Sequence, residues 1–233
     1  FPYTTLFRSK KEGSTSQSFN DVLTVKIKDQ SVGMRNVQKI GIKNPGVKIG
    51  ENYTDYTQGS FRITDNTYDL ALAGDGFFAI EFTNKAGETD TKYTRAGQFT
   101  LNKDGYLVTE EGDYVLDTQN RRIRLNTLLD SKITDDGTIY QNDQAVARIQ
   151  VTDFEDYDYL EKYGETYYQP IEGAKTTTAD AQVKSGYLEM ANVQIVSEMV
   201  NLISITRAYE SNQKVVQTID GTLDVAANQI GKL

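Results

Sequence analysis

The stretch from Asn192 to Leu233 reads NVQIVSEMVNLISITRAYESNQKVVQTIDGTLDVAANQIGKL, and it decides the architecture of the chain. Every seventh residue in this stretch is apolar: Ile195, Leu202, Tyr209, Val216, Leu223 and Ile230. Residues seven apart lie on the same side of an α-helix, and a long seven-residue repeat is typical of helices that pack lengthwise on other helices. The repeat predicts one helix of about 40 residues, roughly 60 Å long at about 1.5 Å per residue. Asn192 is the candidate N-cap of this helix.

The positions that flank this stripe mix apolar and polar side chains. One flank holds Met199, Thr206, Gln213, Asp220 and Ala227, and the other holds Glu198, Ile205, Asn212, Ile219 and Ala226. A helix packed in the core of its own domain would bury several of these polar groups without partners, which costs free energy. That packing is the alternative. The pattern favours an assembly interface that comprises Met199 and the six stripe residues.

The composition excludes several classes of function. The formal net charge is −8, the sequence pI is about 4.7, and the chain has no His, Cys or Trp. An acidic chain is a poor match for nucleic acid, which needs a basic face. Without His and Cys, the commonest general base, thiolate nucleophiles and zinc sites are excluded. We predict no catalytic, cofactor or metal site, and no insertion into a membrane, because no apolar run reaches about 18 residues.

The first nine residues, FPYTTLFRS, match the translation of the end of a common sequencing adapter, TTTCCCTACACGACGCTCTTCCGATCT. We therefore interpret residues 1–9 as a library artefact and exclude them from the fold. On this hypothesis the natural N-terminal segment is missing and true sequence begins near Lys10. Re-sequencing the locus from intact genomic DNA tests the hypothesis, which fails if these codons lie in the genome.

The remaining chain divides by its pattern of apolar residues. Residues 10–52 are polar with short alternations and predict an extended segment. Residues 53–169 show short alternating runs separated by turn signals, which predict a β-rich domain of the all-β sandwich or partly closed barrel type. Ala145 to Phe154 is expected to be its last long strand, and residues 170–191 a polar connector to the helix. The fold class is thus mixed: a β domain followed by a long helix over 192–233.

Three polar clusters inside the β region invite functional interpretations. Gly74-Asp75-Gly76 lacks the third glycine or the Lys-Ser/Thr of a phosphate loop, so a tight turn is expected. The acidic run around residues 153–158 lacks the spacing of a calcium loop, and a solvated loop is expected there. Asn102 to Gly105 has the composition of an ordinary hairpin turn.

Several multi-residue motifs resemble those of the bacterial flagellar rod and hook proteins. The C-terminal motifs are Gly186–Glu189, Asn192–Val193, Glu198–Ile203, Arg207, Ala208, Tyr209, Glu210 and Asn212. The upstream motifs, in the same order as in that family, are Thr57–Gly59, Asp69–Ala71, Gly74–Phe78, Tyr93–Gly97 and Asp104–Leu107. The resemblance extends from about Lys10 to Leu233.

This resemblance implies a structural subunit of the flagellar basal body. Such subunits are exported unfolded by the flagellar type III apparatus, and they polymerise helically into a hollow shaft that carries torque from motor to hook. Their N- and C-terminal helices form the inner tube and the β domain forms the outer layer. The implied partners are copies of the chain itself, other rod and hook proteins, and the rings around the rod. The N-terminal partner helix expected before Lys10 is absent.

Within the family, the chain length and the segment Gly46–Gly50 resemble the distal-rod members most closely. A proximal-rod or hook subunit is the alternative within the family. From a different class, a secreted carbohydrate-binding or lytic protein is the alternative for the β region alone.

Overall fold

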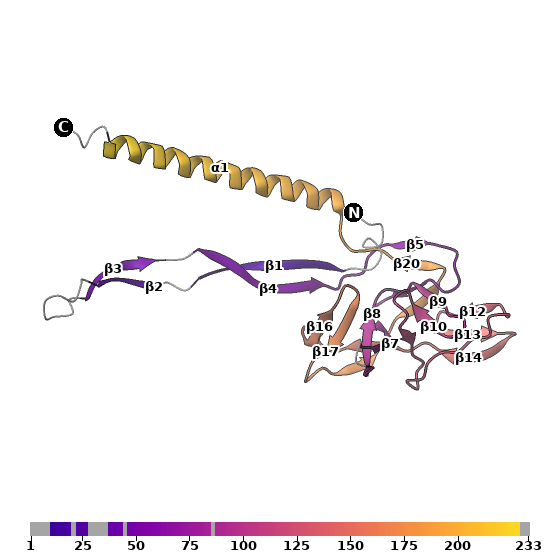
Figure 1. The fold of residues 1–233 in the computed structure, drawn as a ribbon. Coiled ribbons are helices and arrows are strands. Elements are labelled where there is room, and N and C mark those ends of the chain that lie inside the picture. Colours follow the sequence, from indigo (N-terminus) through magenta and orange to yellow (C-terminus); the bar gives the residue numbers. More distant parts are fainter. Residues whose placement is uncertain (1–9, 20–21, 28–36, 44–45, 85–86, 229–233) are drawn as a thin grey trace. The chain divides into compact units, whose positions relative to one another are not determined.

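The computed structural model describes residues 10–19, 22–27, 37–43, 46–84 and 87–228. The chain divides into two compact units, Phe1–Asn192 and Val193–Leu233. The first unit is built from strands and the second contains one long helix (Figure 1). This confirms the predicted combination of a β domain with a long C-terminal helix. Among the described residues, no helix is both long and apolar enough to span a membrane.

The segment predicted as extended forms two antiparallel ribbons. Strand β1 (Lys11–Ser18) pairs with β4 (Val47–Asp55), and a bulge lies between Ser14 and Ser16. Strand β2 (Val22–Ile27) pairs with β3 (Val37–Lys43). Most side chains of β1 and β4 are exposed. The first ribbon is therefore held mainly by its own backbone ladder rather than by a core.

A nine-stranded antiparallel sheet forms the centre of the β domain. Along the main path its strands run in the order β16-β17-β8-β7-β11-β10-β9, while β15 pairs with both β7 and β18. The sheet is open, because β16 and β9 end this path without meeting. The strands are β7 (Phe77–Thr83), β8 (Thr89–Thr94), β9 (Phe99–Leu101), β10 (Leu107–Thr109), β11 (Tyr114–Val115), β15 (Val151–Phe154), β16 (Leu160–Tyr163), β17 (Tyr167–Pro170) and β18 (Thr176–Thr178).

Smaller sheets complete the domain. Strands β12 (Ser131–Ile133), β13 (Thr138–Gln141) and β14 (Gln144–Arg148) form a three-stranded sheet. Strand β6 (Leu70–Ala73) pairs with β19 (Gln182–Ser185), and β5 (Phe61–Ile63) pairs with β20 (Tyr187–Glu189). A short 3-10 helix, η2 (Tyr157–Tyr159), precedes β16. The pairs β6–β19 and β5–β20 join early strands to strands late in the chain.

Two expectations about the end of the β region differ from the structure. The run from Ala145 to Phe154 is not one strand but parts of two, β14 and β15, which belong to different sheets. The chain changes sheets at Gln150, whose backbone N–H donates to Leu116. Five more strands follow, and three of them, β18, β19 and β20, lie within the predicted connector. Those three strands are short and largely polar, so they lack the alternation of apolar and polar residues that predicts a strand. They pair with β15, β6 and β5.

Strand β7 separates two hydrophobic clusters. Its residues Phe77 to Ile80 are fully buried, because successive side chains point to opposite faces and both faces are covered. Phe78 belongs to the first cluster, and Phe77 and Ala79 belong to the second. The first cluster also includes Leu70, Leu72, Phe99, Leu107, Val115, Ile123, Ile139, Ile149 and Val183, and the second includes Tyr93, Leu116, Phe154, Leu160 and Tyr168.

The three polar clusters are structural. Gly74 and Gly76 have φ angles of +121° and +135° in the turn between β6 and β7, so side chains would be strained there. The Asn102 side chain accepts hydrogen bonds from the backbone of Asp104 and Tyr106 in the hairpin between β9 and β10. In the acidic run, Asp153 accepts from the Tyr157 hydroxyl and Asp156 caps η2. Asn102 and Asp156 thus stabilise their own turn and loop, while Asp75 and Glu155 form ion pairs with Arg95 and Lys175.

The long helix α1 extends over Ile195–Asn228, 34 residues. Gln194 begins it, because the Gln194 carbonyl accepts the hydrogen bond from the Glu198 N–H. Asn192 is not the N-cap that the sequence suggested, since its side chain is bonded to residues 11, 55 and 57 instead. The predicted stripe residue Ile230 lies outside the described residues.

The buried carboxylate of Asp117 gives a test of the β domain. Its oxygens accept hydrogen bonds from the backbone of Gln119 and from the backbone and side chain of Arg121. Burial by itself would raise the pKa of Asp117, but these hydrogen bonds outweigh burial and hold the pKa below its usual value. The carboxylate therefore stabilises the fold above the pKa of an unfolded Asp, about 3.9, and the stabilisation is lost as the pH falls through the lower folded value.

We expect Asp117→Asn to lower the free energy of unfolding at pH 7 by about 1–3 kcal/mol, because charged hydrogen bonds are lost. The difference should shrink below about pH 4, where the unfolded carboxyl is protonated. Urea unfolding at several pH values measures both effects. The control is the exposed Asp130→Asn, which should change stability by less than about 0.5 kcal/mol. A loss of stability that does not depend on pH would contradict this account of the carboxylate.

Candidate assembly interface

The described residues of the predicted stripe lie on α1 with their side chains in solvent. No residue of α1 is buried. The described members of the predicted interface are between 42% and 68% exposed: Ile195, Met199, Leu202, Tyr209, Val216 and Leu223. Large apolar side chains at this spacing and this exposure are typical of a surface that another helix covers.

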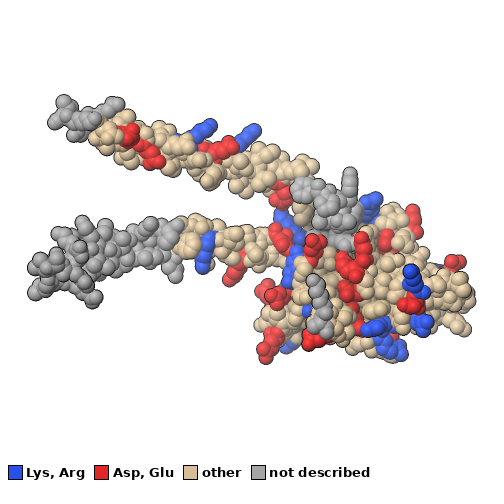
Figure 2. Space-filling view, viewed as in Figure 1, with Lys and Arg blue, Asp and Glu red and all other residues tan. Residues whose placement is uncertain are grey.

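The apolar surface of α1 is wider than the seven-residue repeat indicated. Seven further large apolar residues of α1 are also exposed: Val196, Val200, Ile203, Ile205, Val215, Ile219 and Val225. Figure 2 shows α1 as a largely uncharged surface with few Lys, Arg, Asp and Glu side chains. Ile205 and Ile219 lie on a flank of the predicted stripe, but the seven-residue repeat does not indicate the other five. A count of apolar residues on every side of the helix would have found them.

The family-motif residues Arg207, Ala208, Tyr209, Glu210 and Asn212 lie together in the middle of α1. All five are exposed. Their direct role in assembly stays a prediction.

A buried carboxylate joins three distant segments just before α1. Glu189, on β20, is 4% exposed and forms an ion pair with the ammonium of Lys10 at 2.6 Å. The same Oε1 atom of Glu189 accepts the backbone N–H of Gly59 at 3.0 Å. Its other oxygen accepts from Arg95 at 3.4 Å. The Lys10 ammonium also donates to the carbonyl of Thr57 at 2.9 Å, so both charges are held by several bonds. We call this set of residues the Glu189 cluster.

Both cations of the Glu189 cluster are buried. Arg95 is 6% exposed, and its guanidinium lies over the ring of Phe77 at 5.4 Å. Burial lowers the pKa of Lys10 below its usual value, although Glu189 opposes that shift. A buried ammonium or guanidinium without its carboxylate would be strongly unfavourable. The cluster therefore fixes the start of β1, the segment at Thr57 and the chain that leads into α1.

Asn192 makes a second connection between the same segments. Its side-chain oxygen accepts the backbone N–H of Lys11 at 2.6 Å. Its amide group donates to the carbonyl of Asp55 and the hydroxyl of Thr57, each at 2.9 Å. Because Lys11 and Asp55 are paired in the β1–β4 ribbon, Asn192 ties the base of that ribbon to the chain just before α1.

Two motif glycines are required by close backbone approach. A Cβ atom on Gly59 would lie 1.8 Å from the carbonyl oxygen of Met190. A Cβ atom on Gly97 would lie 1.7 Å from the carbonyl oxygen of Leu70. The two backbones are also joined there by a hydrogen bond from the Leu70 N–H to the Gly97 carbonyl. Thus motifs that are far apart in the sequence, Thr57–Gly59, Asp69–Ala71, Tyr93–Gly97 and Gly186–Glu189, contact one another around the Glu189 cluster.

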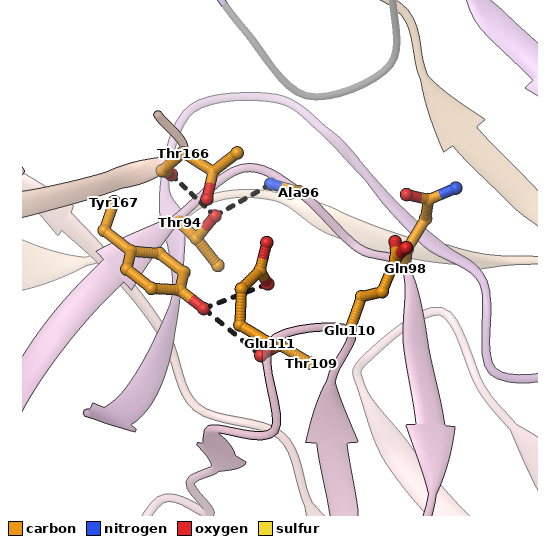
Figure 3. Close-up of a pocket in the computed structure, with 8 residues that line it drawn as sticks. All are labelled: Thr94, Ala96, Gln98, Thr109, Glu110, Glu111, Thr166 and Tyr167. Carbon is orange, nitrogen blue, oxygen red and sulfur yellow. Dashed lines mark hydrogen bonds between the residues drawn. The ribbon is translucent and has the colours of Figure 1, made fainter. Parts of the chain in front are cut away.

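The described residues hold no candidate metal centre, since no group of three or more Asp and Glu side chains converges among them. The small cavity in Figure 3 has a volume of about 10 Å³, room for one water at most. At its wall the Tyr167 hydroxyl lies 2.7 Å from Asp113 and 3.2 Å from both Glu111 and Thr109. Burial, together with Asp113, raises the pKa of Tyr167 above its usual value, so this phenol is a neutral hydrogen-bond donor. The site cross-links strands and is too small for a substrate.

Comparison with known proteins agrees with this arrangement. The family model for the C-terminal region of flagellar basal body rod FlgEFG proteins matches residues 184–230, which contain β20, Asn192 and α1. The model for the D1 domain of flagellar hook protein FlgE/F/G matches residues 71–141 of the β domain.

Individual relatives cover most of the chain. The flagellar basal-body rod protein FlgF of Caulobacter vibrioides is 36% identical over 181 residues, 77% of this chain and 71% of the relative. FlgG of the same organism is 34% identical over 227 residues, 90% of this chain and 84% of the relative. FlgG of Bacillus subtilis is 32% identical over 212 residues, 85% of this chain and 77% of the relative.

The two family models and these relatives thus place the chain in the class of flagellar rod and hook structural proteins. The chain belongs to the flagellar basal-body rod protein family and is a structural subunit of the flagellar basal body.

Removing the charge at the centre of the Glu189 cluster should destabilise the β domain. In Glu189→Gln the buried Lys10 and Arg95 lose their common counter-charge, so we expect the free energy of unfolding to fall by about 3–5 kcal/mol. The matched control is Glu165→Gln, an exposed glutamate, for which the change should stay below about 0.5 kcal/mol. Urea unfolding followed by tyrosine fluorescence measures both. Equal stabilities of the two variants would contradict the role given to Glu189.

Proposed function

We propose that the chain polymerises through α1 into the shaft of the basal-body rod, which carries torque from the motor to the hook. The single observation that supports this most is the exposure of every large apolar side chain along 34 residues of helix. Membership of the rod family supports assembly with other rod and hook proteins. The proposal includes contacts between copies of this chain and rings that surround them.

The energetics of α1 favour assembly over an isolated helix. Full burial of a Val, Leu, Ile or Met side chain contributes about 1.5–3 kcal/mol. An isolated helix gains none of this, and most helix stability in proteins comes from packing of an apolar face. Contacts with neighbouring helices would supply that packing along a length of roughly 50 Å at about 1.5 Å per residue. Many such contacts in series would give a shaft that resists twisting.

The β domain fits a different role in the same shaft. It has its own buried clusters and therefore needs no neighbour to fold. The Glu189 cluster and Asn192 anchor the chain that enters α1 to this domain. In the proposed rod the domain forms the outer layer, and these anchors are the route by which load passes between the outer layer and the helix.

A secreted carbohydrate-binding or lytic protein is the weaker alternative. The cavity beside Tyr167 is too small for a sugar. Two larger hollows, of about 420 and 540 Å³, are open to solvent and lie around Tyr140 and Arg124, so the weight against this alternative comes from the family of the chain. A structural role without catalysis agrees best with these observations and with the family.

The position within the rod is part of the proposal. The resemblance of the segment Gly46–Gly50 to distal-rod members supports the distal rod, while relatives named FlgF and FlgG match with similar identity. Immunogold labelling of isolated basal bodies tests this assignment. We expect label on the hook side of the rod, and label on the motor side would make the chain a proximal subunit.

Charged substitutions on the stripe should prevent assembly. We expect Leu202→Asp and Val216→Asp each to reduce incorporation into basal bodies by roughly 10- to 100-fold, because each removes about 1.5–3 kcal/mol of apolar burial. Swimming in soft agar should be lost in parallel. Because no residue of α1 is buried, thermal unfolding of the β domain should not change. Gln217→Asp, on a polar side of α1, is the control, and a defect as large as that of Leu202→Asp would contradict the proposed interface.

A further inference from the structure

The last residues of the first unit run antiparallel along a much earlier segment of the chain. Strand β19 pairs with β6, and β20 pairs with β5, beside which it lies in Figure 1. Between these two pairs, Gly186 donates its N–H to the carbonyl of Asp69 and accepts the N–H of Thr64 at its own carbonyl. The bonds form one line, in which residues 182–192 run along residues 55–73. We call this line of contacts the closing seam.

The early side of the closing seam depends on the late side. Within the described part of the chain, β5 pairs with no strand except β20, and β6 pairs with no strand except β19. Leu70 and Leu72 of β6 are fully buried. An open seam would therefore leave buried backbone groups of β6 without hydrogen-bond partners, which costs free energy. Strand β6 keeps its place in the core only with residues from the end of the domain.

The late side of the closing seam is part of the core. Val183 of β19 is 1% exposed and packs in the first hydrophobic cluster, which also contains Leu72 and Phe78. Away from β6, the N–H of Val183 donates to the carbonyl of Asp135 at 2.9 Å. The ammonium of Lys184 lies 2.7 Å from the Asp135 carboxylate. Strand β19 thus connects β6 to the turn between β12 and β13.

Opening the closing seam would also separate buried charges. Glu189 lies on the late side of the seam, and its partners Lys10 and Arg95 are both buried. The guanidinium of Arg95 lies over the ring of Phe77, which belongs to the second hydrophobic cluster. A buried cation without its counter-charge is strongly unfavourable. An open seam therefore disturbs both clusters, the first through Val183 and the second through Arg95.

We propose that the closing seam makes the β domain a single folding unit, which stays unfolded until residues 182–192 are in place. A chain is synthesised from its N-terminus, so residues 10–181 are available first, and they have no stable fold of their own. The domain folds only when Asn192 is present, and by then only the second unit, Val193–Leu233, remains to follow. A chain that is cut short before the seam carries no folded β domain. This inference does not depend on the proposed assembly.

Cysteine labelling of the full-length chain tests the proposal, since the chain has no cysteine of its own. Val183→Cys places a thiol in the closing seam, and Val115→Cys places one in the central sheet on β11. The two sites are matched, because each replaces a valine of the first cluster that is at most 1% exposed. The rate of reaction with a thiol reagent, at urea concentrations below the unfolding transition, measures how often each site opens.

The substitutions themselves lower stability, so urea unfolding of each variant supplies the correction. Leu188→Cys on β20 and Leu107→Cys on β10 are a second matched pair of buried sites, used if Val183→Cys does not fold. Adding Glu189→Gln to each variant weakens the closing seam at its charged end.

We expect the corrected rates at positions 183 and 115 to agree within about threefold and to show the same dependence on urea, because the seam opens only when the whole domain unfolds. Adding Glu189→Gln should raise both rates by the same factor. A rate at position 183 at least about tenfold higher, with a weaker dependence on urea, would overturn the proposal, since the seam would then open while the sheet stays folded. A rise confined to position 183 on adding Glu189→Gln would overturn it too.

Discussion

The carboxylate of Glu189 is the interaction on which the organisation of the β domain depends. It forms ion pairs with two buried cations and accepts a backbone N–H, and its partners come from residues 10, 59 and 95. Desolvated charges of this kind are tolerated only when all of them are paired. The pairing therefore selects one arrangement of the ribbon, the sheet and the chain that continues into α1. Asn192 reinforces this arrangement with neutral hydrogen bonds to the same segments.

The features predictable from the sequence were those with a strong period. The seven-residue repeat located α1, and alternation with turn signals located the β-rich region. The bounds of single strands were not predicted correctly, since the run from Ala145 to Phe154 contains parts of both β14 and β15. Gly74, Gly76 and Asn102 occupy turns, as their residue types predicted. The strands β18, β19 and β20 were not predictable in this way, because short polar strands are specified by the backbone hydrogen bonds of a distant partner rather than by their own pattern.

The candidate interface and the Glu189 cluster were also only partly predictable from the sequence. The seven-residue repeat predicted that apolar side chains of α1 form an interface. It did not predict the full apolar surface of α1, because a search at one spacing leaves out apolar residues at other positions around the helix. The Glu189 cluster could not be found from the sequence either, since Lys10 and Glu189 are 179 residues apart and single charged residues carry no periodic signal. The family motifs contain Gly59, Arg95 and Glu189 but not Lys10, and only the structure shows that these residues contact one another.

The attachment of residues 189–192 has a mechanical consequence. The Glu189 carboxylate and the Asn192 side chain bind residues at the start of β1, at the end of β4 and in the segment at residues 57–59. A pull on the chain at Asn192 therefore loads several bonds together, and these bonds lead to both strands of the β1–β4 ribbon. A force that enters the domain at this point is divided over two paired strands instead of peeling one strand away from its partner.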